Sequence, residues 1–390
     1  MILQLLQTIF SPMISWDDSW PLVAACIAAV IGALLIVKGL LASGVKKNGN
    51  RSPPGPWGVP VLGYLPFIRK PYHVAFKELS EQYGPIIRLR LGSKDVIVLN
   101  DLASIREGLT NPDVLYRSED FVFRYLGLQG IAAINGQPWQ ENRRYCFHVL
   151  RNLGFAKKSM EAHIQEEVQC FMDILASGKG EPMLVARTLA SSVSNNISAL
   201  VFGQRYDLGD AKGRFIEGLL SKFLRQANFF SLTDFLPALR ALAVRIPNTQ
   251  LYIMKSVLSE LTQFIRNEVK EREGSTNDHS DKDFIDGYLR KIKESNGKDS
   301  HFSLRYLEAS TINFYSAATN TVRSVVLWNL YIAASDPDGH QARVQQEIDA
   351  AIGRERPPAW EDRRRMPFTM ASILEALRWR TTAPISVPRA

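Results

Sequence analysis

Residues Asn313–Trp328 read NFYSAATNTVRSVVLW, and the rest of the chain is best interpreted outward from them. They lie in a segment from Ser303 to Ser335 that has no proline, few charges and apolar residues at helical spacing. We therefore predict a long central helix buried in the core. In its middle, small and polar residues replace the leucine or isoleucine that a core helix prefers, which indicates that something else fills the space beside it. A close crossing of two helices would explain the same small residues.

Ala317–Thr321, AATNT, carries the first chemical signal. The hydroxyl of Thr321 can donate to the carbonyl of Ala317, four residues earlier, and so bend or open the turn. The stretch resembles the oxygen-activating part of the central helix of cytochrome P450 haem-thiolate monooxygenases, usually Ala-Gly-x-acid-Thr. Ala318 stands where glycine is usual, and Asn320 stands where an acid is usual. The resemblance implies that Thr321 positions water and a proton. Because an amide does not titrate, proton delivery would run through waters and Thr321, or be slow.

Composition sets the broad class of protein. The chain has 390 residues, 46% of them hydrophobic, which is enough for one large core or two ordinary ones. A net charge of +8 suits anionic lipid, an acidic protein or nucleic acid, but no zinc-finger spacing, RNA-binding signature or concentrated basic helix supports nucleic acid. Cys26, Cys146 and Cys170 are too widely spaced for a disulfide framework or a metal-ligand pair. A reducing, cytosol-facing main domain is the expectation.

The N-terminus predicts a membrane anchor. Residues 21–42 are almost entirely apolar and can reach the length of a bilayer span. Acidic residues precede this run and basic residues follow it, so the positive-inside rule places residues 1–20 in the lumen and the chain after Lys46 in the cytosol. A cleaved signal peptide is the alternative, but the run starts late and has no basic region before it.

Residues 43–60 form a basic, proline-rich linker, in which Pro53–Gly58, PPGPWG, is stiff and extended. Residues 61–390 form the main domain, for which we predict a mainly α fold with a small β-sheet (α+β). The sheet is a hairpin of Ile86–Leu91 and Asp95–Leu99, two alternating runs separated by Gly-Ser-Lys. A proline-glycine hinge directly after a basic-flanked anchor is similar to the start of microsomal cytochrome P450s.

A second informative stretch is Gly136–Leu153, GQPWQENRRYCFHVLRNL. Trp139 and Arg143 are four residues apart and share one helical face. Arginine can clamp a carboxylate with paired hydrogen bonds, and an indole N–H can donate a third, although a solvated basic helix would have the same charges. The stretch resembles the Trp-x-x-x-Arg helix of cytochrome P450s. The resemblance implies that Trp139 and Arg143 bind a propionate of haem b, and that Arg144 and its neighbours face an electron donor.

The third stretch, LEALRW, puts Glu375 and Arg378 three residues apart, where they can form an ion pair. With the preceding ARVQQEIDAAIG run and the segment around Arg365–Thr369, it matches the order and spacing of microsomal cytochrome P450s. The resemblance covers Pro53–Ala390 and implies the cytochrome P450 fold. It also implies that Glu375 and Arg378 hold the core around the haem, that Arg389 contacts a propionate, and that Ala317 lies against the cofactor.

The haem ligand of that family is a cysteine in a Phe-x-x-Gly-x-Arg-x-Cys-x-Gly loop, C-terminal to all of these motifs, and no such loop occurs in the 390 residues. None of Cys26, Cys146 and Cys170 has this context, and His148 or His163 would be remote substitutes. Because the thiolate favours O–O cleavage, we expect a chain truncated before its axial ligand, without a metal site of its own and incompetent for the family reaction.

For the complete protein, the resemblance implies insertion of one O2-derived oxygen atom into an apolar small molecule. Electrons would come from NADPH through NADPH-cytochrome P450 reductase, with cytochrome b5 as a further donor. The enzyme would be a single-pass protein of the endoplasmic reticulum membrane, in contact with lipid and facing the cytosol. Two alternatives stay open. One is an isomerase of peroxides or endoperoxides on the same fold, for which the missing acid at Asn320 would be no loss, and the other is a non-catalytic, membrane-anchored fragment.

Overall fold

A computed structural model describes residues 52–207, 209–226, 231–273, 281–295 and 301–390. The predicted lumenal segment, the anchor at 21–42 and the linker as far as residue 51 lie outside this range. Within it, no helix combines the length and the apolar character that crossing a membrane requires. The chain divides into two units, Met1–Gly108 and Leu109–Ala390, which are described separately.

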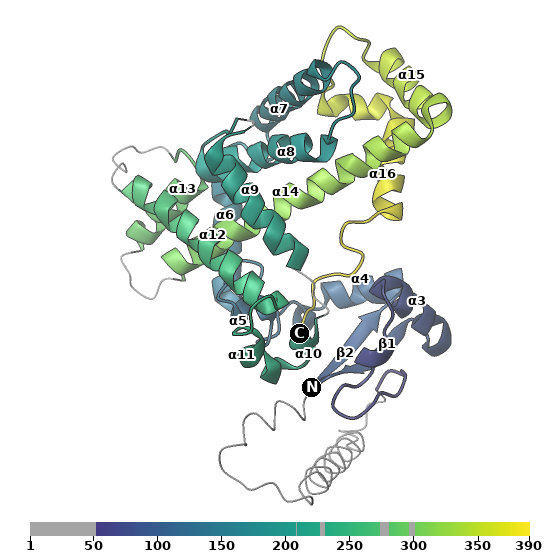
Figure 1. The fold of residues 1–390 in the computed structure, drawn as a ribbon, viewed down its shortest axis with the longest axis vertical. Coiled ribbons are helices and arrows are strands. Elements are labelled where there is room, and N and C mark those ends of the chain that lie inside the picture. The colour runs from purple at the N-terminus through teal and green to yellow at the C-terminus, as the bar shows by residue number, and fades with distance from the viewer. Residues whose placement is uncertain (1–51, 208, 227–230, 274–280, 296–300) are drawn as a thin grey trace, which may run out of the picture. The chain divides into compact units, whose positions relative to one another are not determined.

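The first unit is built on the predicted hairpin (Figure 1). Strand β1 (Ile86–Leu91) pairs antiparallel with β2 (Lys94–Leu99), so that Leu91 faces Lys94 across a two-residue turn, one residue shorter than predicted. Alternate residues of β1 are fully buried, as a strand with one face on the core requires. The other elements of this part are η1 (Leu65–Phe67), α3 (Tyr72–Tyr83) and α4 (Leu102–Thr110).

The proline-glycine segment lies along this hairpin and forms neither helix nor strand from Pro53 to Gly58, as predicted. Gly63 forms bridges to Val59 and Leu91. Its φ is +60°, and a Cβ there would lie 2.0 Å from the carbonyl oxygen of Arg90. Only glycine therefore allows the segment to approach the strand this closely.

The second unit is helical and carries the long central helix that the sequence predicts, α14 (Leu304–Ser335). In Figure 1, α14 runs from the helices α6, α12 and α13 towards α15. The remaining elements of the second unit are η2 (Pro112–Val114), α5 (Val122–Tyr125), α6 (Gly136–Asn152), α7 (Lys158–Ser177), α8 (Val185–Phe202), α9 (Ala211–Gln226), α10 (Leu232–Phe235), η3 (Pro237–Leu239), α11 (Arg240–Ala243), α12 (Gln250–Glu273), α13 (Phe284–Glu294), η4 (Pro337–Gln341), α15 (Ala342–Ala351), η5 (Trp360–Arg365) and α16 (Pro367–Trp379).

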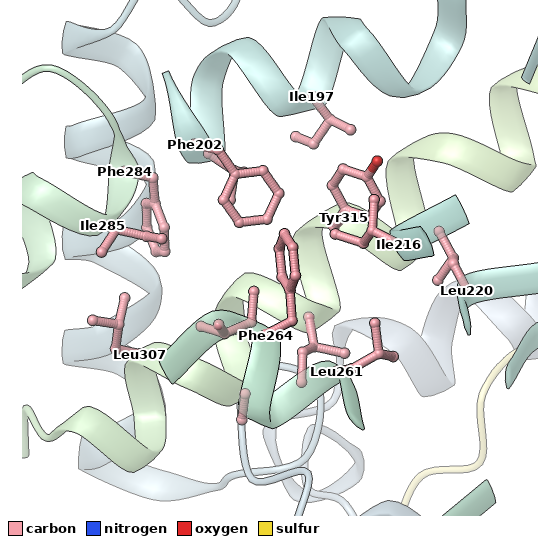
Figure 2. Packing of buried hydrophobic residues seen from close by; sticks show 14 of the residues in the cluster. Ile197, Phe202, Ile216, Leu220, Leu261, Phe264, Phe284, Ile285, Leu307 and Tyr315 are labelled. Carbon is pink, nitrogen blue, oxygen red and sulfur yellow. The ribbon is translucent and has the colours of Figure 1, made fainter. Parts of the chain in front are cut away.

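The first half of α14 lies in the main hydrophobic core. The helix begins where the side chain of Ser303 accepts a hydrogen bond from the amide of Tyr306, which caps its first turn. Leu307 and Tyr315 then pack among side chains from α8, α9, α12 and α13 (Figure 2). The rings of Phe202 and Tyr315 lie 5.6 Å apart. This packing is what holds α14 in the middle of the unit.

The second half of α14 differs from the prediction. Val322 is 48% exposed and Leu330 is 42% exposed, so the predicted burial of this helix does not hold at these two residues. In the described part of the chain, α16 packs along this half, where Trp328 meets Trp379 edge to face at 5.9 Å. Val326 and Leu327 pack on another side against Phe171 of α7 and Leu189 and Val193 of α8, so the second half of α14 is partly covered and not fully enclosed.

Candidate functional site

Segments that are far apart in the sequence meet at the short stretch Gly130–Ala132. The side chain of Asn313 on α14 accepts a hydrogen bond from the amide of Ala132 at 3.1 Å. The indole N–H of Trp139 donates to the carbonyl of Ile131 at 3.1 Å, and Nε of Arg117 donates to the carbonyl of Ala132 at 3.2 Å. One loop therefore ties α14, α6 and the segment before α5 together.

Arg117 also binds the end of the chain. Its Nη1 donates to the carbonyls of Val387 and Pro388 at 3.1 and 2.8 Å, and the amide of Ala390 donates to the carbonyl of Tyr116 at 2.8 Å. These bonds bring Arg389 close to Arg117. The sequence analysis missed Arg117 because an arginine in a loop, without helical spacing to any partner, carries no signal of its own.

Arg117 and Arg389 give this part of the second unit a strong positive charge, and we call the two guanidinium groups the carboxylate corner. Burial, together with the charge of Arg389, lowers the pKa of Arg117. The guanidinium of Arg117 donates to backbone carbonyls, and no carboxylate in the described part of the chain pairs with either guanidinium. Arg117 is partly buried and Arg389 is exposed, and a partly buried cation beside another cation is stabilised when an anion joins them. The arrangement can therefore bind a carboxylate or another planar oxyanion.

On α14 the predicted residues divide between two sides of the helix. Ala317 and Thr321 are exposed, and the hydroxyl of Thr321 donates to the carbonyl of Ala317 at 2.7 Å, which confirms the predicted bond. The helix stays regular through this turn, so the bond does not open it. Asn320 is half-buried and accepts a hydrogen bond from Nη2 of Arg323 at 2.7 Å, a pairing that the sequence analysis did not anticipate.

On α6, Trp139 and Arg143 share one face as predicted, and Phe147 extends it. The guanidinium of Arg143 lies 5.6 Å from the ring centre of Trp139 and 5.0 Å from that of Phe147. The indole N–H of Trp139, for which the resemblance implies a propionate acceptor, donates in this structure to the carbonyl of Ile131. Arg143 itself is exposed, and so is Arg144. Stacking fixes the plane of the Arg143 guanidinium and leaves its edge available to an acceptor.

The predicted ion pair on α16 is confirmed. Arg378 donates two hydrogen bonds of 2.6 Å to the carboxylate of Glu375, and these bonds lower the pKa of Glu375. Both side chains are exposed, at 60% for Glu375 and 71% for Arg378. A pair this open to water contributes little to stability.

The residues present fit part of a haem. Ala317 and Thr321 present small, exposed side chains on one side of α14, against which a flat ring can lie, and the Arg117–Arg389 pair suits two carboxylates. The described cysteines do not fit an axial thiolate. Cys146 is fully buried in the main core, and burial raises the pKa of its thiol to about 12. Cys170 lies on α7, beside Arg205.

Comparison with known proteins defines the class. The cytochrome P450 family model matches residues 53–390, and the chain belongs to that family. It is thus related to oxidoreductases that use haem b in monooxygenase reactions, and the predicted mainly α fold with a small sheet is confirmed.

Among particular relatives, cytochrome P450 2A12 of Mus musculus is 31% identical over 92% of this chain and 73% of its own length. Cytochrome P450 2C29 of Mus musculus is 34% identical over 87% of this chain and 70% of its own length. Cytochrome P450 2A9 of Mesocricetus auratus is 31% identical over 93% of this chain and 74% of its own length. The likeness to each spreads over most of the described residues.

Proposed function

We propose that this protein takes part in NADPH-driven insertion of one oxygen atom from O2 into an apolar small molecule. The electrons come through NADPH-cytochrome P450 reductase, with cytochrome b5 as a further donor. The meeting of Arg117, Arg389 and α14 around Gly130–Ala132 is the observation that supports the proposal, since two neighbouring guanidinium groups suit a carboxylate.

Each site residue has a role in this proposal. Arg117 and Arg389 bind the haem carboxylates, and Arg143, fixed by stacking on Trp139, supplies a further donor at the same edge. Ala317 lies against the ring. When bound, haem supplies the redox chemistry of O2 activation.

Thr321 and Asn320 act on water and protons. Because the Thr321 proton is donated to Ala317, the hydroxyl oxygen is left with lone pairs that can accept a hydrogen bond and so position a water. The carbonyl oxygen of Asn320 accepts a hydrogen bond from Arg323, so the amide has its NH2 group left to donate, and that group cannot titrate.

A porphyrin-binding experiment tests the carboxylate corner without needing an axial ligand. Protoporphyrin IX and its dimethyl ester are titrated into the full chain and followed by fluorescence. We expect the free acid to bind roughly 10- to 100-fold more tightly, because charge-assisted hydrogen bonds contribute about 1.5–3 kcal/mol. Arg389→Gln should shrink this preference, and Arg364→Gln, an exposed arginine of η5, should not. Equal binding of acid and ester by the wild-type chain would refute the assignment.

The described cysteines bear on catalysis. Since neither Cys146 nor Cys170 fits the axial position, we expect no turnover from these 390 residues alone. A haem stoichiometry near zero with retained helical circular dichroism would favour a non-catalytic, membrane-anchored fragment. Stoichiometric haem incorporation would argue against that alternative.

The pairing of Asn320 with Arg323 favours one second candidate, isomerisation of a peroxide or endoperoxide without a reductase. Such a substrate brings its own oxygen and needs no titrating acid at this position. A form of the protein that carries an axial cysteine distinguishes the two. Turnover that depends on NADPH and reductase supports the monooxygenase, and turnover of a hydroperoxide without either supports the isomerase.

The electron donor would dock on the exposed basic side of α6, to which Arg144 and Arg151 belong. Attraction between exposed charges is screened by salt. Reductase binding, measured by surface plasmon resonance, should therefore weaken as ionic strength rises, and Arg144→Gln should weaken it further. Binding that does not depend on salt would exclude an electrostatic contact there.

A further inference from the structure

Arg240, the first residue of α11, is a buried cation that the proposed haem site does not use. Its side chain is only 3% exposed. Nε donates to the carbonyl of Thr233 at 2.8 Å, and the guanidinium carbon lies 5.6 Å from the ring centre of Tyr125 on α5. The group is thus held by α5 on one side and by the start of α10 on the other.

The hydrogen-bonding capacity of this guanidinium is not used up. Nη2 is buried and has no hydrogen-bond partner, and no ion pair formed by the described residues includes Arg240. A buried charge without a counter-ion is costly, and a buried donor without an acceptor adds to the cost. Buried polar groups in native proteins are nearly always hydrogen-bonded, so an unsatisfied one calls for an explanation, and a ligand that accepts its hydrogen bond is one.

The elements that hold Arg240 carry further aromatic side chains besides Tyr125. Phe123, two residues before Tyr125, packs on Phe121 at 5.0 Å and on Phe223 of α9 at 5.8 Å between ring centres. Phe235 of α10 is buried as well. A single cation among aromatic side chains matches a molecule with one anionic end and an apolar body.

We propose that Nη2 of Arg240 binds the carboxylate of an amphipathic, otherwise apolar acid. Since Nη2 is shielded from solvent, the acid must part the short elements that enclose it, α10, η3 and α11, which have four, three and four residues. Elements this short have few internal hydrogen bonds and open at a low free-energy cost. Oxidation of the bound acid rests on the proposed function, whereas binding of the acid at Arg240 does not.

Isothermal titration of the full chain in detergent with decanoate and with decan-1-ol tests this proposal. The two probes share their apolar chain, and at about pH 8 only the acid is ionised. We expect decanoate to bind about tenfold more tightly than the alcohol. Arg240→Gln should abolish the preference and Arg240→Lys should retain part of it, while Arg245→Gln, which removes an exposed arginine nearby, should leave it unchanged.

Each outcome decides for or against the site. Equal binding of acid and alcohol by the wild-type chain, or a preference that survives Arg240→Gln, overturns it. If Arg240→Gln unfolds, as circular dichroism would reveal, the lysine variant decides, because a merely structural arginine would not confer a preference for the acid. Neither haem nor reductase takes part. Loss of porphyrin binding with an intact decanoate preference would therefore count against the proposed function and leave this site standing.

Discussion

Asn320 and Arg323 form a polar pair on the half-buried side of α14, with 2.7 Å between Oδ1 and Nη2. Nε of Arg323 is buried and has no partner, so the guanidinium can accept more negative charge than the amide offers. This explains how an uncharged residue is accommodated at a position where the family usually has an acid. It also determines what an acid would do there.

We predict that Asn320→Asp does not restore a proton donor. The new carboxylate would pair with Arg323, which should hold its pKa below the usual range and keep it ionised near neutral pH. The variant should be about 0.5 kcal/mol more stable than the wild type at pH 7. A carboxyl with a lowered pKa stabilises above its unfolded pKa, so the gain should disappear as pH falls through the folded value.

Urea unfolding at neutral and acidic pH measures this gain. Asn320→Asp/Arg323→Gln is the matched control, because it keeps the carboxyl and removes the cation. If the double variant is as stable as Asn320→Asp, Arg323 is not the partner. Proton delivery in a form with an axial cysteine should recover only in the double variant.

At the scale of elements, α14 combines a buried half and an accessible half in one unbroken helix. Leu307 is fully buried in the main core, and Leu330 is 42% exposed. Leu307→Ala should lower the free energy of unfolding by about 2–5 kcal/mol, because it leaves a cavity in a packed core. Leu330→Ala makes the same chemical change in the same helix and should stay within about 0.5 kcal/mol. Denaturant midpoints measure both, and similar losses would show that burial does not govern this helix.

The start of α16 is held by a side chain from α15. The carboxylate of Glu347 accepts hydrogen bonds from the amides of Phe368 and Thr369 at 2.9 and 2.7 Å, and from the Thr369 hydroxyl at 2.7 Å. Burial pushes the pKa of Glu347 up, but the bonds from Thr369 and Phe368 outweigh it and the pKa is lowered. The ionised form is the one that caps the helix.

Glu347→Gln should therefore speed hydrogen exchange at the amides of Phe368 and Thr369 near neutral pH. Since the pKa is lowered, the stabilisation is present above the ordinary carboxyl pKa and is lost as pH falls through the folded value. Protection factors of wild type and variant should converge in acid. A difference that persists there would mean that the cap does not depend on ionisation.

At the scale of the whole molecule, Arg272 joins three helices of the second unit. From α12 it donates to Asp283 at 2.8 Å, to the carboxylate of Glu268 at 3.0 Å and to the carbonyl of Phe202 at 2.8 Å. Burial raises the pKa of Asp283, although the amide of Asp286 and the charge of Arg272 oppose it. The carboxylates are tolerable in the core only because the guanidinium neutralises them.

Arg272→Met should cost about 3–5 kcal/mol of unfolding free energy, because it leaves buried carboxylates without a cation. Without Arg272 the pKa of Asp283 should rise further, so the carboxyl takes up a proton more readily in acid. The deficit should thus be largest near neutral pH and shrink as pH falls. Arg305→Met, an exposed arginine at the start of α14, is the control and should change stability by less than about 0.5 kcal/mol. A deficit that does not vary with pH would show that lost packing, not charge, is responsible.

The chain as a whole is also predicted to be anchored in the endoplasmic reticulum membrane through residues 21–42. Deletion of residues 1–51 should shift the protein from the alkali-resistant pellet of a microsomal preparation to the supernatant. The full chain should stay in the pellet, because an apolar run of this length does not leave the bilayer at high pH. Equal extraction of both forms would refute the anchor.

Periodicity and local chemistry in the sequence determined the elements. The bounds of α14, the hairpin, α6 with Trp139 and Arg143 on one face, and the bonds Thr321–Ala317 and Arg378–Glu375 all follow from spacings of two, three or four residues. Such contacts are set by backbone geometry, so they can be predicted without knowing what surrounds the element.

Only the tertiary structure decided where those elements lie and which distant residues meet. It brings Arg117 to Arg389, anchors Trp139 on Ile131, leaves Leu330 of α14 exposed and buries Arg240 without a counter-ion. Burial depends on which elements pack together, and a contact between positions hundreds of residues apart leaves no periodic trace in the sequence. For that reason the sequence revealed the class of chemistry, while the cations that would hold its ligands emerged only from the fold.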